Sequence, residues 1–176
     1  LLVESSSFFS CKTSSGSGGA IRFINTDSGQ CVLNEVCGYD CVITSGSWGI
    51  FARINVKDAA SSKNYVNYSS ISRCVEVSYN SYNVLGLTNG KILLPSTNIS
   101  MNKCRERPAM YCNPFSDSSS VICSLSYSSI VDNDAFDDNC IMFTRTGAKT
   151  EIKYCNILRN TEVKLNGRGT IYTDGN

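Results

Sequence analysis

The chain has 176 residues, which is enough for one domain of ordinary size with a sizeable hydrophobic core. Sixteen Lys and Arg residues nearly balance fifteen Asp and Glu residues, and a formal charge of +1 without any basic run argues against a nucleic-acid partner. No stretch approaches the roughly 18 apolar residues that a membrane-spanning helix needs, so no transmembrane segment is predicted in this portion.

The chain is predicted to consist of short strands separated by polar loops. Residues 1–11 lack the basic region and cleavage site of a signal peptide. They are interpreted instead as a strand that is already in progress. Residues 19–23, 49–54 and 140–143 are β-branched or aromatic and too short for helices, so each predicts a strand. Apolar residues do not recur at helical spacing over three turns anywhere, and the sequence therefore predicts an all-β fold.

One short motif recurs along the whole chain: a bulky residue, two arbitrary residues, and then Cys or Asn. Successive copies lie about 30 residues apart, which is typical of a solenoid whose repeats pack only against their neighbours. The copies run from Phe8 to Cys11, Ile71 to Cys74, Met101 to Cys104, Ile130 to Asn133 and Ile157 to Asn160, with Gly38 to Cys41 as a degenerate sixth copy.

Two or three short strands per repeat, without helices between them, predict a parallel β-helix of about six coils. We expect residues 1–176 to form one segment. Its coils are predicted at approximately 1–30, 31–63, 64–91, 92–120, 121–148 and 149–176. Because neither end has an amphipathic cap, we expect a fragment of a longer protein, with further coils of the same chain or neighbouring subunits end to end.

The Cys or Asn that closes each motif is expected to stack on its copies along the axis. Asn can ladder its side-chain amides there, and Cys can fill the same slot as a small apolar residue. We expect most of these thiols to be free and buried, because stacked parallel side chains do not point toward one another. The predicted internal corner column contains Cys11, Cys41, Cys74, Cys104, Asn133 and Asn160.

Among the remaining cysteines, Cys112 and Cys140 lie at similar distances past their corners and are the candidate disulfide pair. Two acceptor sequons for N-glycosylation begin at Asn67 and Asn98. Together with ten cysteines, these sequons favour an extracellular or cell-surface location.

Four acidic residues follow the fifth corner closely: Asp132, Asp134, Asp137 and Asp138. Such a cluster is either a solvated turn or a weak calcium site, because Ca²⁺ binds clustered carboxylate and carbonyl oxygens. No other cofactor is predicted. A zinc site is not expected, since the chain has no His and no Cys-x-x-Cys pair.

The repeat resembles the polymorphic outer-membrane protein repeats, a family of surface proteins defined by a GGAI-type motif paired with an FxxN motif. Residues 18–21 match the first motif as they stand, and residues 130–133 and 157–160 are similar to the second with Ile in place of Phe. Residues 8–11 match it with Cys in place of Asn. The resemblance implies a right-handed parallel β-helix with an adhesive or structural role, and the Cys-rich corners and sequons fit eukaryotic surface proteins better than a bacterial one.

Because right-handed β-helices also include pectin-degrading enzymes, a catalytic function has to be considered. Residues 25–27 and 137–141 look like the acidic segments of polygalacturonases, but they lie about 110 residues apart and the histidine of that family is missing. Without His, no Ser-His or Cys-His nucleophile pair exists either. Trp48, the only Trp, is expected to be packed or partly exposed surface and not a platform for sugar stacking.

We therefore expect a non-enzymatic structural or adhesive segment of a large extracellular or filament-forming glycoprotein. A host-cell or glycan ligand is a further candidate partner. Two alternatives from other classes remain open: a carbohydrate-active β-helix of the polysaccharide hydrolase or lyase type, and a calcium-dependent carbohydrate- or protein-binding module.

Overall fold

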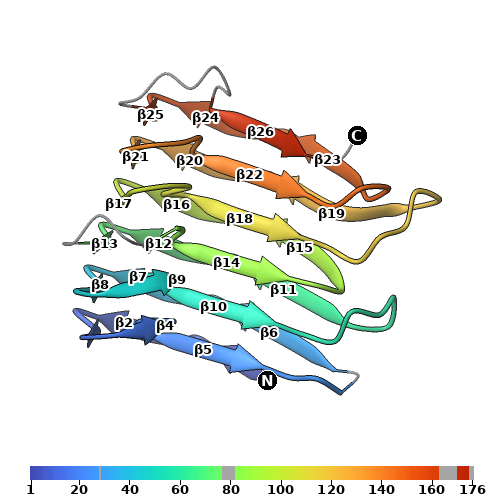
Figure 1. Cartoon of the computed structure of the whole chain (residues 1–176), viewed down its shortest axis with the longest axis horizontal. Helices are drawn as coiled ribbons and strands as arrows, with labels where there is room; N and C mark the ends of the chain where they lie inside the picture. The colour runs from blue at the N-terminus through green and yellow to red at the C-terminus, as the bar shows by residue number, and fades with distance from the viewer. Residues whose placement is uncertain (28, 77–81, 163–169, 175–176) are drawn as a thin grey trace.

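The computed structural model describes residues 1–27, 29–76, 82–162 and 170–174, and all regular structure among them is β-strand. The strands form four six-stranded sheets and one two-stranded sheet, in which every pairing is parallel. Figure 1 shows the coils stacked one on the next from the N-terminus to the C-terminus. The predicted all-β parallel solenoid is confirmed, while its right-handed sense stays a prediction.

Each coil passes through four sheets, which we label I to IV in chain order. Sheet I contains β1 (Leu2–Glu4), β6 (Gln30–Asn34), β11 (Lys63–Asn67), β15 (Lys91–Pro95), β19 (Val121–Ser126) and β23 (Lys149–Lys153). Sheet II contains β2 (Ser7–Phe9), β7 (Cys37–Tyr39), β12 (Ser70–Ser72), β16 (Asn98–Ser100), β20 (Ser129–Val131) and β24 (Asn156–Leu158).

Sheet III contains β3 (Lys12–Thr13), β8 (Val42–Ile43), β13 (Val75–Glu76), β17 (Lys103–Cys104), β21 (Asp134–Ala135) and β25 (Thr161–Glu162). Sheet IV contains β5 (Ile21–Ile24), β10 (Ala52–Asn55), β14 (Leu85–Thr88), β18 (Met110–Asn113), β22 (Ile141–Thr144) and β26 (Ile171–Asp174). The two-stranded sheet pairs β4 (Gly16–Ser17) with β9 (Gly46–Trp48).

The prediction of two or three strands per coil was wrong, because every coil contributes a strand to each of four sheets. The strands of sheets II and III have only two or three residues, which is too short for an alternating pattern to stand out. The strand expected at 19–23 also starts later, at Ile21. Its beginning is delayed because Gly18 adopts a left-handed conformation (φ 74°) that turns the chain into the strand.

Sheet II is bounded in every coil by two corners that each consist of a single left-handed residue. The values of φ at these corners lie between 44° and 58°, although none of the residues is Gly. The first corner is Ser5, Glu35, Tyr68, Ser96, Tyr127 or Tyr154, and the second is Ser10, Asp40, Arg73, Met101, Asp132 or Arg159. In the first five coils each corner N–H still bonds to the next coil, as in Tyr68 N to Pro95 O at 3.2 Å, so the bend interrupts no inter-coil bonding.

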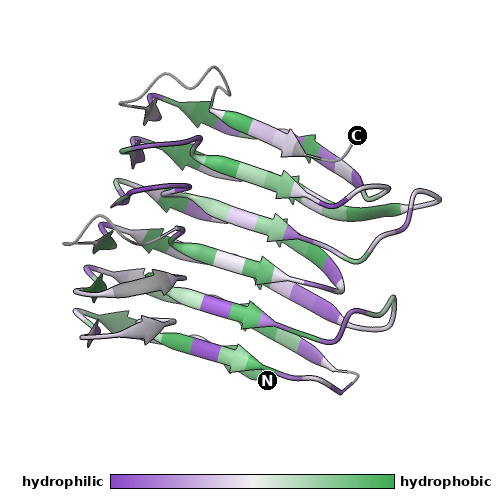
Figure 2. Cartoon of the chain, viewed as in Figure 1, coloured by the Kyte–Doolittle hydropathy of each residue, from purple (hydrophilic) through white to green (hydrophobic). Residues whose placement is uncertain are grey.

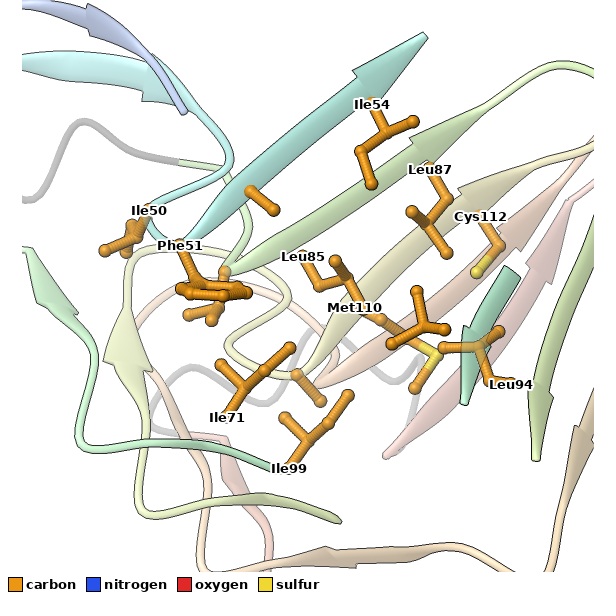
Figure 3. Close-up of a cluster of buried hydrophobic side chains, with 14 of the residues drawn as sticks. Ile50, Phe51, Ile54, Ile71, Leu85, Leu87, Leu94, Ile99, Met110 and Cys112 are labelled. Atoms are coloured by element: carbon orange, nitrogen blue, oxygen red, sulfur yellow. The ribbon is translucent and has the colours of Figure 1, made fainter. Parts of the chain in front are cut away.

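The core lies inside the coils, where equivalent residues stack in register. In sheet II the inward column is Phe8, Gly38, Ile71, Ile99, Ile130 and Ile157. Ile71, Ile99 and Ile130 are completely buried. Figure 3 shows Ile71 and Ile99 beside Phe51, which enters the same space from the segment before β10. Figure 2 shows hydrophobic residues along the strands and many hydrophilic residues in the loops between them.

Gly38 is the one gap in the sheet II column, and the ring of Phe51 fills it. A Cβ added to Gly38 would overlap Cε2 and Cδ2 of that ring. Phe51 also contacts Phe8 edge-on, with ring centroids 6.0 Å apart. The degenerate copy of the motif is therefore explained by a compensating large residue elsewhere in the same coil.

We predict that Gly38→Ala lowers the free energy of unfolding by about 1–3 kcal/mol, because the added methyl group overpacks the Phe51 ring. In a Phe51→Leu background the same change should cost much less, since the smaller side chain leaves room for the methyl group. Urea denaturation of the four proteins of this double-mutant cycle measures both costs. Equal costs in the two backgrounds would contradict the proposed compensation.

Candidate functional site

The sheet II register assigns one residue of each coil to an internal corner column, directly after the second left-handed corner. The column consists of Cys11, Cys41, Cys74, Asn102, Asn133 and Asn160. The column runs parallel to the axis of the stack. Its residue is Cys in the first three coils and Asn in the last three.

The three asparagines form a hydrogen-bonded ladder. Asn102 Nδ2 donates to Asn133 Oδ1 at 3.0 Å, and Asn133 Nδ2 donates to Asn160 Oδ1 at 2.9 Å. Each side-chain oxygen also accepts the backbone N–H of the preceding coil's column residue, as in Cys74 N to Asn102 Oδ1 at 2.9 Å. Asn102 and Asn133 are completely buried, and these bonds satisfy polar groups that would otherwise be costly inside the core.

The prediction placed Cys104 in this column, and that assignment was wrong. Ile99, not Met101, occupies the inward column of sheet II, so the fourth corner residue is Asn102. Met101 is the left-handed corner itself and is 53 % exposed. Cys104 lies two residues further on in β17, paired with Ala135, and its thiol donates to Glu106 O at 2.8 Å. Residues 99–104, Ile-Ser-Met-Asn-Lys-Cys, contain two overlapping matches to the motif, and the register selects Ile99 to Asn102 instead of Met101 to Cys104.

The cysteines at the N-terminal end continue the column as a stack of thiols. Cys41 and Cys74 are buried and Cys11 is partly exposed, and all three thiols are free. A hydrogen bond from the Cys74 thiol lowers the pKa of Cys41, whereas donating that bond and being buried raise the pKa of Cys74. Burial raises the pKa of Cys11. In this half of the column, weak thiol contacts take the place of the hydrogen bonds between side-chain amides that link the asparagines.

A second axial column, which the sequence analysis missed, lies directly after the first left-handed corner. It consists of Ser6, Val36, Ser69, Thr97, Ser128 and Cys155. Ser128 Oγ accepts the backbone N–H of Thr97 at 3.0 Å and lies 3.1 Å from Leu94 O. Thr97 Oγ1 in turn donates to Val66 O at 2.9 Å. A sequence signal for this column exists: a Ser or Thr precedes most of the Cys or Asn residues of the corner column, always at the same spacing.

The candidate disulfide between Cys112 and Cys140 is absent from the structure, and none of the ten cysteines forms a disulfide. Cys112 lies in β18 opposite Phe143, while Cys140 precedes β22 and is bonded through its backbone to Ala109. The two positions therefore belong to different columns. Cys112 instead neighbours Cys123 across the core, and the hydrogen bond to that thiol, together with burial, raises the pKa of Cys112.

The four acidic residues proposed as a weak calcium site are not gathered around one point. Each pairs with its own basic residue: Asp132 with Arg159, Asp134 with Lys103, Asp137 with Arg105 and Asp138 with Arg107. The hydrogen bond from Arg159 lowers the pKa of Asp132. Among the described residues, no group of three or more acidic or Cys side chains is arranged to hold a metal ion.

The two sequons differ in their surroundings. Asn98 is exposed on sheet II, and its Nδ2 donates to Ser70 Oγ at 3.4 Å. Asn67 is partly exposed at the end of β11. The hydroxyl group of its sequon, on Ser69, is buried in the second axial column and donates to Asn67 O at 2.7 Å.

Comparisons with protein-family models, with curated proteins and with solved structures find no match to this chain. Within the described residues, the structure contains no helix of the length and apolarity required to cross a membrane. The candidate site therefore has to be interpreted from its own residues. Two internal polar columns, a set of inter-coil ion pairs and an apolar core together describe a regular stack of coils.

We predict that Asn133→Ala lowers the free energy of unfolding by about 3 kcal/mol, because a buried amide that bonds to two neighbouring coils is removed. Asn156→Ala, an exposed Asn in the neighbouring strand β24, serves as the control and should change stability by no more than about 0.5 kcal/mol. Thermal and urea unfolding measure both variants. Similar effects of the two substitutions would show that the ladder contributes nothing specific.

We predict that alkylation of the folded chain labels Cys11, Cys37 and Cys155 rapidly, because only these three cysteines are partly exposed. The other seven should react only after unfolding, and denaturation without reductant should then expose ten reactive thiols. Mass spectrometry after iodoacetamide treatment counts the labels. A lower count after denaturation would reveal a disulfide, with Cys112 and Cys123 as the first pair to examine.

Proposed function

We propose that this chain is a non-enzymatic structural or adhesive segment of a larger extracellular protein, in which the solenoid acts as a shaft or filament element. The observation that carries the proposal is the exposure of core-type side chains at both ends of the stack. In the inner column of sheet I, Leu33, Val66, Leu94 and Leu125 are completely buried. The last member of that column, Ile152, is 36 % exposed, and the first, Val3, is partly exposed.

The other columns repeat this pattern. Ile141 is completely buried in sheet IV, whereas its neighbour in the final strand, Ile171, is 37 % exposed. The outermost strands also have one edge without a partner among the described residues. Unpaired parallel edges and exposed apolar side chains favour the addition of another coil, either from the same protein or from a neighbouring subunit.

The lateral surface favours a shaft role as well. Pairs of residues on adjacent coils hold the outside of the stack together, as in the ion pair between Asp132 and Arg159 and the stacked rings of Tyr127 and Tyr154, whose centroids lie 5.0 Å apart. With the internal Asn ladder, these contacts brace the last three coils against one another on several sides. An exposed sequon at Asn98 is compatible with a glycosylated outer surface.

The proposal predicts end-to-end association of the chain. Small-angle X-ray scattering over a concentration series should show particles that lengthen at constant cross-section, and Ile152→Lys should reduce this association because it places a charge on the exposed end of the core. Tyr154→Lys, a change at a 73 % exposed position on the side of the same coil, should leave association unchanged. Thermal unfolding checks that both variants are folded.

A chain that stays monomeric at every concentration, or particles that thicken instead of lengthening, would contradict the proposal. Equal effects of the two Lys substitutions would also contradict it, since association would then not depend on the ends.

A further inference from the structure

Trp48, the only Trp in the chain, lies beside the outer face of sheet IV and between the rings of two tyrosines. Its ring centroid is 5.5 Å from that of Tyr82 and 5.3 Å from that of Tyr111, at interplanar angles of 30° and 71°. All three residues are partly exposed. They come from three successive coils, so only the stacking of the coils brings them together.

Next to these rings the sheet surface is hollowed. In the outward column of sheet IV, Gly86 lies between Arg53 on one side and Tyr111 on the other. Since Gly86 has no side chain, its backbone forms the floor of a notch of about 170 Å³, whose walls include Trp48, Arg53 and Tyr111. The polar side chains of Asn55 and Thr88 line the same notch.

The charge of the notch is positive. The Arg53 guanidinium lies 6.0 Å from the centroid of the Trp48 ring and donates one hydrogen bond to Ser17 Oγ at 3.0 Å. A guanidinium has five N–H donors, so several remain for a ligand. Arg22 is paired in register with Arg53 on the neighbouring coil and is exposed. No ion pair joins either arginine to a carboxylate of the described residues.

We propose that this notch, which we call the Trp48 notch, binds a saccharide unit that carries a carboxylate or a sulfate group. The aromatic rings offer apolar faces against which the C–H face of a sugar ring can pack. Arg53 and Arg22 complement the anionic group, and Asn55 and Thr88 are placed to bond to hydroxyl groups. The sequence predicted that Trp48 is packed or partly exposed surface; it is partly exposed, and it forms one wall of the notch.

Two other ligand classes fit less well. A cationic ligand would face the positive charge of Arg53, which already lies over the Trp48 ring. Single-stranded nucleic acids bind along a positively charged groove that follows several nucleotides, whereas this notch is a single hollow of about 170 Å³. The inference does not depend on the proposed end-to-end association, because the notch lies on the side of the stack.

Because Trp48 is the only Trp, its fluorescence reports directly on the notch. The probes are oligogalacturonate for a carboxylated saccharide, heparin fragments for a sulfated one, neutral cello-oligosaccharides, and a short oligonucleotide as the rival anion. We expect a saturable change in Trp48 emission with at least one of the two acidic saccharides, and the one that binds identifies the source of the anionic group. Neutral sugars should bind at least about tenfold more weakly.

Variants locate the binding. Arg53→Gln and Tyr111→Ala should each weaken acidic saccharide binding by about tenfold, because one removes the charge and the other an aromatic wall. Arg73→Gln is the matched control, since Arg73 lies 5.3 Å from the Tyr39 ring in a comparable cation–π contact outside the notch. Calorimetry with the same probes verifies the fluorescence, and circular dichroism verifies that each variant is folded.

Several results would overturn the proposal. One is the absence of any saturable change in Trp48 emission at acidic saccharide concentrations on the order of 10 mM. Neutral sugars that bind as tightly as acidic ones, or an oligonucleotide that binds more tightly, would also contradict it. The last is an equal loss of acidic saccharide affinity in Arg53→Gln and Arg73→Gln. Since none of these readouts measures association of the stack, failure here leaves the proposed shaft role to its own test.

Discussion

The backbone hydrogen bonds between successive coils are the interaction on which the rest of this structure depends. The strands of sheets I to IV bond to the coils above and below, so each coil is stable only where its neighbours match it in register. The segment between the two left-handed corners has the same length in all six coils, from Ser5 to Ser10 through Tyr154 to Arg159. The coils differ in length mainly in the segments before and after sheet IV, with one extra residue between Val121 and Cys123 in β19, and sheet II acts as the constant reference of the stack.

The constant register explains why polar residues can be buried in an otherwise apolar core. Asn133 is fully satisfied only when a coil above and a coil below present their own amides at the same height. A slip of one residue would leave those groups unpaired inside the core, which is far more costly than the loss of an exposed hydrogen bond. The Asn ladder and the hydroxyl column thus specify the register, while the apolar columns supply most of the burial.

Much of this architecture is visible in the sequence, because the corner motif has a nearly constant period and combines a buried apolar residue with a small polar one. The misplaced fourth corner shows the limit of such a pattern: Met101 is as bulky as Ile99, and only the inter-coil register distinguishes them. The hydroxyl column escaped notice because Ser is abundant throughout the chain. The Trp48 notch could not be predicted, since its residues come from three coils and become neighbours only through stacking.

The left-handed corners have a consequence for the engineering of this protein. Each places a non-glycine residue in a conformation that costs roughly 1 kcal/mol, and none of these corner residues is Asn, the side chain that best tolerates that conformation without the entropy cost of Gly. Their side chains point outward, as the 67 % exposure of Tyr68 illustrates, so replacement would disturb no core contact. Asn is therefore a stabilising replacement to test at corners such as Tyr68. The corners whose side chains join adjacent coils, Asp132 with Arg159 and Tyr127 with Tyr154, would lose that contact in the exchange.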